Sequence, residues 1–146
     1  MGPVAQRVEY RATEPRYSDA DDSTSMSANL ATAYPEKAGV LRWIRTATLD
    51  RKAGAVRLDE SFQLKKPQTV ALVFMTSKQP AIEGGNVRVG KAVLLCDPSK
   101  LTATSERIAL TDPAFRHTWG DALYRILLTT PVPVSKGSRK VKIRSA

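Results

Sequence analysis

Cysteine and histidine are nearly missing from this sequence, which has one of each among its 146 residues. A single cysteine, Cys96, excludes an internal disulfide framework and any zinc site built from several thiolates. A single histidine, His117, excludes the metal-binding motifs that require two histidines. The sequence therefore predicts neither a bound metal ion nor a cofactor.

Long apolar runs are missing as well. The longest, residues 70–76, has the length of a β-strand, whereas a membrane-spanning helix needs about 18 or more apolar residues. Charged residues at positions 7, 9 and 11 also follow too early for the apolar core of a signal peptide. We expect no membrane contact, and any export signal would lie outside this sequence.

Acidic residues are scarce relative to basic ones. The chain has 23 Lys and Arg against 14 Asp and Glu, a formal net charge of +9. This balance favours contact with polyanions. Nucleic acid is not the expected partner, because the sequence lacks a helix-turn-helix pattern, a zinc site and a surface-aromatic β motif.

Helical periodicity is weak throughout, and short segments of alternating apolar and polar residues dominate instead. This pattern predicts a single all-β domain over residues 1–146, an antiparallel two-sheet β-sandwich of about nine short strands. We expect the first strand over residues 4–13, an acidic loop over 19–25 and another loop over 111–120. Residues 69–75, apolar on both faces, are expected to form a central strand covered on both sides.

A hairpin over residues 39–64 has the clearest register in the sequence. A four-residue turn at 51–54 sets opposite each other the positions whose numbers sum to 105. Trp43 then opposes Phe62 as a core aromatic pair, and Leu41 opposes Leu64. Arg45 opposes Glu60 on the same apolar face, where each charge needs its partner.

Three segments resemble the C-terminal β-sandwich region of heparinase II/III-like polysaccharide lyases: Ala33–Asp50, Leu58–Leu64 and Trp119–Ile126. The similarity extends from about Val8 to Ile143. The resemblance implies a modular parent with an N-terminal α-helical toroid and catalytic His, Tyr and Asn residues in the parts that precede this region. It implies upstream lyase domains as partners, and a periplasmic or secreted location if the parent is a typical bacterial lyase.

No catalytic residue is carried over from this resemblance, and the isolated chain is not expected to be an enzyme. His117, Trp119, Tyr124 and Arg125 are types that could remove a proton beside a uronate carboxylate. The alternation of strand residues instead favours Tyr124 as a core residue, Arg125 as the partner of an acid and His117 as a surface residue. Cys96 is expected to be a buried, inert thiol.

A basic strip close to the end of the sequence is the candidate binding site. It contains no acid, and its cations are Lys136, Arg139, Lys140, Lys142 and Arg144. One interpretation is a surface that attracts acidic polysaccharide or another polyanion. The other is an edge strand whose charges discourage pairing with a second chain.

Three functions follow as hypotheses. The first is a non-catalytic C-terminal module that supports the catalytic β-region of a heparinase II/III-like lyase. The second is a stand-alone carbohydrate- or polyanion-binding module. The third is an interaction domain, which would leave a contiguous apolar patch exposed.

Overall fold

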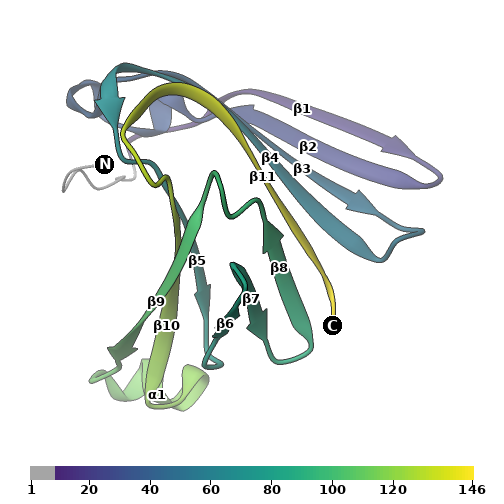
Figure 1. Cartoon of the computed structure of the whole chain (residues 1–146), viewed down its shortest axis with the longest axis vertical. Coiled ribbons are helices and arrows are strands. Elements are labelled where there is room, and N and C mark those ends of the chain that lie inside the picture. Colours follow the sequence, from purple (N-terminus) through teal and green to yellow (C-terminus); the bar gives the residue numbers. More distant parts are fainter. Residues whose placement is uncertain (1–8) are drawn as a thin grey trace.

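The computed structural model describes residues 9–146 and consists of two antiparallel sheets that face each other (Figure 1). This confirms the predicted all-β, two-sheet sandwich, although the sandwich is open at its sides. The described residues form eleven strands, against about nine expected. The strands are β1 (Thr13–Ala20), β2 (Ser23–Asn29), β3 (Val40–Asp50), β4 (Ala55–Gln68), β5 (Ala71–Thr76), β6 (Ala81–Glu83), β7 (Asn86–Val89), β8 (Ala92–Cys96), β9 (Thr102–Ala109), β10 (Ala122–Thr129) and β11 (Val134–Ser145).

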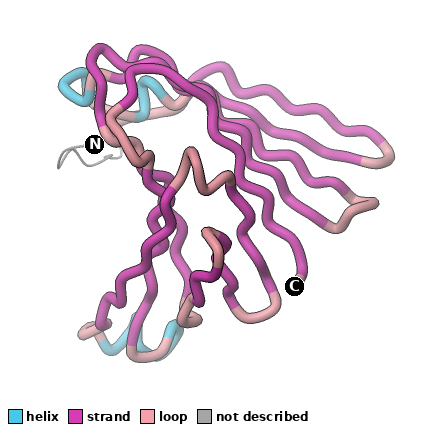
Figure 2. Tube along the Cα trace, viewed as in Figure 1, coloured by secondary structure: helices cyan, strands magenta, loops and turns pink. Residues whose placement is uncertain are grey.

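The two sheets differ greatly in size. The large sheet has the order β1-β2-β3-β4-β11-β8-β7-β6, and the small sheet has the order β5-β10-β9. Helical segments are short: two 3₁₀ turns, η1 (Ala31–Ala33) and η2 (Glu36–Ala38), and one α-helix, α1 (Pro113–Trp119). Figure 2 shows that helices lie only at the two ends of the molecule and do not cover either sheet. Each sheet must therefore bury its apolar face against the other.

The β3–β4 hairpin has the predicted register along most of its length. Trp43 pairs with Phe62 and Arg45 pairs with Glu60 in the ladder. The ladder shifts between Val40 and Arg42, so Leu64 opposes Val40 instead of Leu41. This bulge turns Leu41 out of the core, and its side chain is largely exposed.

The core lies between the inner faces of the two sheets. Paired residues of antiparallel strands point to the same face, so the inner face of the large sheet follows from its ladders. The buried cluster joins large-sheet residues to small-sheet residues, and its members are Trp43, Phe62, Leu64, Val70, Leu72, Val87, Leu94, Leu101, Ile126, Leu128 and Val141.

One carboxylate, that of Glu60, is buried inside this core. Its side chain is 1% exposed and accepts hydrogen bonds from Nε1 of Trp43 and Nε of Arg45, both at 2.6 Å. Trp43 also packs against Phe62, with ring centroids 5.4 Å apart. The predicted ion pair and the predicted aromatic pair are therefore both confirmed, and the indole links them.

The N-terminal expectations were wrong in their boundaries. Part of the strand expected over residues 4–13 lies outside the described residues, and residues 9–12 are not in a strand. The acidic stretch expected as a loop instead completes β1 and begins β2, leaving Asp21 and Asp22 as the turn. Its charges are accommodated because they lie at an exposed hairpin tip, where Asp19 pairs with Arg51 at 2.7 Å.

Two further expectations are corrected in the small sheet. β5 is an edge strand and not a central one, and Val73 and Met75 on its outer face are 53% and 51% exposed. Only the inner face of β5 packs against the large sheet, so the side chains of its outer face are exposed to solvent. The loop expected over 111–120 contains α1, which Asp112 caps: its carboxylate accepts a hydrogen bond from the N–H of Ala114 at 2.8 Å.

The small sheet covers only part of the large one. β1, β2 and β3 extend beyond it as a wing (Figure 1). One cross-strand row of the inner face runs through Tyr17, Met26, Ala47, Leu58 and Val141. Along this row the exposed fraction falls from 66% at Tyr17 and 63% at Met26 to 0% at Val141. The inner face of the wing therefore exposes one apolar row. Polar residues flank this row on the same face, with Asp19 and Thr24 on one side and Arg45 on the other.

We predict that Glu60→Ala destabilises the fold by about 3 kcal/mol, because the indole N–H loses its buried acceptor and Arg45 loses its partner. Urea unfolding of the purified chain measures this change. Glu60→Gln, which keeps an oxygen acceptor for Trp43, should lose less. Glu36→Ala removes an exposed ion pair with Lys65 and should change the free energy of unfolding by less than about 1 kcal/mol. A wild-type midpoint for Glu60→Ala would contradict this account of the core.

Candidate anion-binding surface

The predicted basic strip lies entirely on β11, which is a central strand between β4 and β8. β8 pairs only with residues 141–145 of β11, so the edge-strand interpretation is wrong for Lys142 and Arg144. Residues 134–140 have a ladder partner among the described residues only on the β4 side. Because strand residues alternate, the ladders place four of the five cations together on the outer face of the large sheet: Lys136, Lys140, Lys142 and Arg144.

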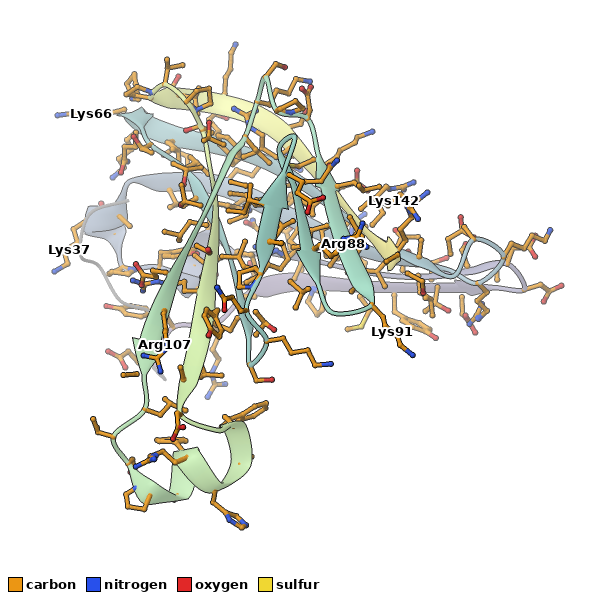
Figure 3. The ribbon with its side chains drawn as sticks, turned by 60° about the horizontal axis from the view of Figure 1, so that its bottom comes forward. Lys37, Lys66, Arg88, Lys91, Arg107 and Lys142 are labelled. Atoms are coloured by element: carbon orange, nitrogen blue, oxygen red, sulfur yellow. The ribbon has the colours of Figure 1, made fainter. Side chains whose placement is uncertain are left out.

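Neighbouring strands add cations to the same outer face. Their ladder partners place Arg42 of β3, Arg57 of β4 and Arg88 of β7 there. In Figure 3, Lys142 and Arg88 project from the same side of the molecule, far from Lys66. The outer face of the large sheet is therefore the strongly basic side of this part of the protein.

Lys142 lies directly opposite Arg57 in the β11–β4 ladder. Like charges that oppose each other in this way destabilise a sheet by some tenths of a kcal/mol. Arg57 is partly neutralised by Asp59, with 2.6 Å between Nε and Oδ2, and Asp59 also lies 3.9 Å from Nζ of Lys140. Among residues 9–146, Lys142 has no ion-pair partner. The Asp59 carboxylate thus lies close to both Arg57 and Lys140, whereas Lys142 has no carboxylate partner among the described residues.

Arg139, the fifth predicted residue, points to the inner face opposite Glu60. Its guanidinium carbon lies 5.6 Å from the centroid of the Phe62 ring, and Nη1 donates to the carbonyl of Ser138 at 2.7 Å. Gly137 makes room for it, because an added Cβ there would lie 3.0 Å from Nη1. The Nε of Arg139 is buried and has no hydrogen-bond partner within the described part of the chain.

A pocket of about 370 Å³ opens where β8 ends beside β11. The last pair of the β11–β8 ladder is Val141 with Cys96, and the chain then turns through Asp97 to Leu101 toward the small sheet. Five cationic side chains and one carboxylate line the pocket, together with Leu95, Cys96, Leu101 and Ser138: Arg57, Lys100, Arg139, Lys140, Lys142 and Asp97. It is a positively charged recess with an apolar wall.

The carboxylate of Asp97 is already occupied within its own turn. It accepts hydrogen bonds from the hydroxyl of Ser99 at 2.6 Å and from the N–H of Ser99 at 3.0 Å. These hydrogen bonds hold the pKa of Asp97 below its usual value. Nζ of Lys100 lies 3.7 Å away. The single acid of the pocket therefore neutralises only a small part of the surrounding positive charge.

Cys96 contributes a half-buried thiol to the pocket wall. Its Sγ donates to the carbonyl of Gly85 at 3.4 Å. Burial raises the pKa of this thiol, and the nearby Asp97 carboxylate raises it further. The prediction of an inert thiol agrees with this environment, because the thiolate is the reactive form.

The residues considered for proton transfer do not meet. His117 and Trp119 are exposed on α1, while Tyr124 and Arg125 are consecutive on β10 and therefore point to opposite faces. Arg125 forms an ion pair with Glu106, as expected for a structural role. Within residues 9–146, no group of three His, Cys, Asp or Glu side chains is arranged to hold a metal ion.

The search for related proteins leaves the resemblance to polysaccharide lyases as a hypothesis. No family model matches the sequence, and no curated protein matches it. None of the helices within residues 9–146 is both long and apolar enough to cross a membrane.

The sequence pattern identifies three of the five cationic residues that line the pocket and misses two. Arg139, Lys140 and Lys142 were candidates, whereas Arg57 and Lys100 were not. Arg57 lies 85 positions before its ladder partner Lys142, and no local signal identifies such a pairing. Lys100 was seen only as part of a turn.

We predict that iodoacetamide modifies Cys96 in the folded chain at least about tenfold more slowly at pH 8 than in the urea-unfolded chain, because burial suppresses the thiolate. Mass spectrometry of timed samples gives the rates without ambiguity, since Cys96 is the single cysteine. Equal rates in the two states would show that the thiol is freely accessible and contradict the described pocket wall.

Proposed function

We propose that this chain is a non-catalytic β-sandwich module that packs against a neighbouring domain of the same polypeptide, as the C-terminal module of a heparinase II/III-like polysaccharide lyase would. The observation that carries this proposal is the uncovered inner face of the wing. Tyr17 and Met26 are more than 60% exposed in the same cross-strand row in which Val141 is fully buried.

The free energy gained by burying the exposed apolar side chains of the wing supports a partner for this face. Burial of apolar surface contributes about 25 cal/mol per Å², and soluble proteins rarely leave contiguous apolar surface unpaired without a binding role. Leu49, in the next inner-facing row of the wing, is 44% exposed as well. A domain seated against the wing would complete the half of the sandwich that the small sheet does not cover.

The residues considered for proton transfer fit the same proposal. Tyr124 and Arg125 project from opposite faces of β10, and His117 lies on a short exposed helix. Proton abstraction requires the base and the group that stabilises the carboxylate to reach one substrate atom together. A supporting role for this module is therefore favoured over a catalytic one.

We predict that the double variant Met26→Lys with Leu49→Lys leaves the free energy of unfolding of the isolated chain within about 0.5 kcal/mol of wild type, because both side chains are already exposed. In the product of the complete gene, the same variant should lower stability and activity, because the lysines would be buried against the adjoining domain. Thermal unfolding and lyase assays of both proteins measure these effects.

The matched control is Ser25→Lys with Thr46→Lys on the opposite face of the same two strands, where neither lysine lies directly opposite a cation. This control should have little effect in either protein. The proposal fails if the complete product tolerates both double variants equally or if its gene encodes no other domain. Release of unsaturated uronide from acidic polysaccharide by the purified chain would also contradict it.

A second function, polyanion binding, is favoured by the basic outer face. This face is opposite to the uncovered inner face of the wing, so the two roles do not compete for one surface. Arg57, Lys142 and Arg144 lie where their strands have ladder partners on both sides, so their backbone positions are fixed. Such a surface attracts a polyanion mainly through its charge, and screening by salt therefore weakens the interaction.

We predict that a sulfated polysaccharide such as heparin binds the purified chain at low ionic strength and that the affinity falls at least about tenfold between 50 and 200 mM salt. Isothermal titration calorimetry at several salt concentrations measures the slope. Neutral dextran provides the control and should not bind. Affinity that does not change with salt, or no binding at 50 mM, would exclude this second function.

A further inference from the structure

The pocket beside the end of β8 combines five cationic residues with apolar lining. The turn after β8 and strand β11 border a volume of about 370 Å³ that is partly open to solvent. Ligand pockets for small molecules typically have volumes of about 300–1,000 Å³. The space is far larger than a bare inorganic anion needs and suits an organic body the size of one sugar ring.

The positive charges around this space are only partly balanced by the carboxylates of Asp59 and Asp97. Arg57, Lys100, Arg139, Lys140 and Lys142 line it, and Asp97 is the single carboxylate in the lining. The sheet also sets Lys142 directly opposite Arg57. A bound anion with more than one negative charge would attract both side chains and offset their mutual repulsion.

Arg139 supplies the second observation. Its Nε is buried without a hydrogen-bond partner in the described residues, and leaving a buried donor unsatisfied is costly. The absence of a side chain at Gly137 leaves the space that its guanidinium occupies over Phe62. Arg139 thus lines the pocket and carries a donor that no described residue uses. An oxygen of an anionic ligand would reach this donor once the guanidinium turns away from Phe62.

We propose that this pocket binds a tetrahedral oxyanion ester, a sulfate or phosphate monoester, carried on a sugar-sized body. Several cations lining one pocket suit a compact group with three terminal oxygens better than a planar monoanionic carboxylate, which one bidentate arginine can satisfy. Leu95, which lies opposite Lys142 on the outer face, supplies apolar surface against which the C–H face of the ring would lie. This inference rests on the second function proposed above, polyanion binding.

Glucose 6-sulfate, glucose 6-phosphate and glucuronate are the probes, titrated into the ¹⁵N-labelled chain at 50 mM salt. The expected result is saturable amide shifts confined to residues 57, 95–101 and 138–142 for one or both esters, and affinity at least about fivefold weaker for glucuronate. The tighter ester identifies the natural source of the group. Glucuronate binding as tightly as both esters would overturn the assignment.

Substitutions of pocket lysines test whether their charges bind the ester. Lys142→Gln should weaken ester binding at least about fivefold without lowering the urea midpoint, because the substitution removes a like-charge opposition. Lys100→Gln should weaken binding similarly, and it serves as a second test on a residue outside the sheet. Lys66→Gln, the control with the same change in net charge, lies at the far end of the molecule (Figure 3) and should have no effect.

Titration with heparin distinguishes ester binding in the pocket from general polyanion binding by the basic face. If heparin binds with salt dependence but neither ester shifts the pocket amides, the pocket assignment fails and general polyanion binding stands. If heparin does not bind either, both fail. A short single-stranded oligonucleotide that displaces the ester more effectively than a sulfated disaccharide would overturn the sugar-ester assignment in favour of phosphodiester recognition.

Discussion

The register that joins β3, β4 and β11 decides how every other surface of this protein is used. Side chains alternate between faces, so a shift of one residue would exchange the two faces completely. Glu60 makes such a shift costly, because its buried carboxylate accepts from both Trp43 and Arg45 only in the observed register. A one-residue slip would also carry Lys140 and Lys142 toward the core, where their charges would lose hydration.

This constraint couples stability to the basic surface. The side chains that fill the core from β11, such as Val141 and Ile143, alternate in sequence with Lys140, Lys142 and Arg144. The hydrophobic effect that buries the first set therefore exposes the second set on the opposite face. The like-charge opposition of Lys142 and Arg57 is a small local cost that the buried row offsets.

Local sequence patterns predicted what depends on local geometry. The turn at 51–54 fixed the β3–β4 register, and through it the Trp43–Phe62 and Arg45–Glu60 pairs. The all-β class followed from alternation alone. The bulge at Leu41 could not be read from the pattern, because apolar residues fill both alternatives there. The helix after Asp112 did carry an aspartate-proline signal for a helix start, and the sequence interpretation overlooked it.

Long-range pairings limited the rest of the prediction. β11 joins β4 and β8, which precede it by scores of residues, and nothing in the Lys- and Arg-rich segment indicates whether it lies at an edge or in the centre. The same limit hid Arg57 and Lys100 from the candidate site. The prediction that β5 is a covered central strand was wrong for a related reason. An apolar strand predicts burial on both faces, but its sequence does not indicate whether this chain or another domain buries the second face.

The uncovered apolar row of the wing and the cations of β11, β4 and β7 lie on opposite faces of the same large sheet. An apolar partner seated under the wing would contact β1, β2 and β3, whereas a polyanion would contact β11, β4 and β7 on the other side. The strands are connected through one continuous ladder, so both ligands can be bound together without steric conflict. Coupling between them would require a change in sheet twist, and the buried Glu60 cluster, at the join between wing and covered core, resists such a change. If a domain covers the wing as proposed, the sheet would hold its basic face at a fixed distance from that domain.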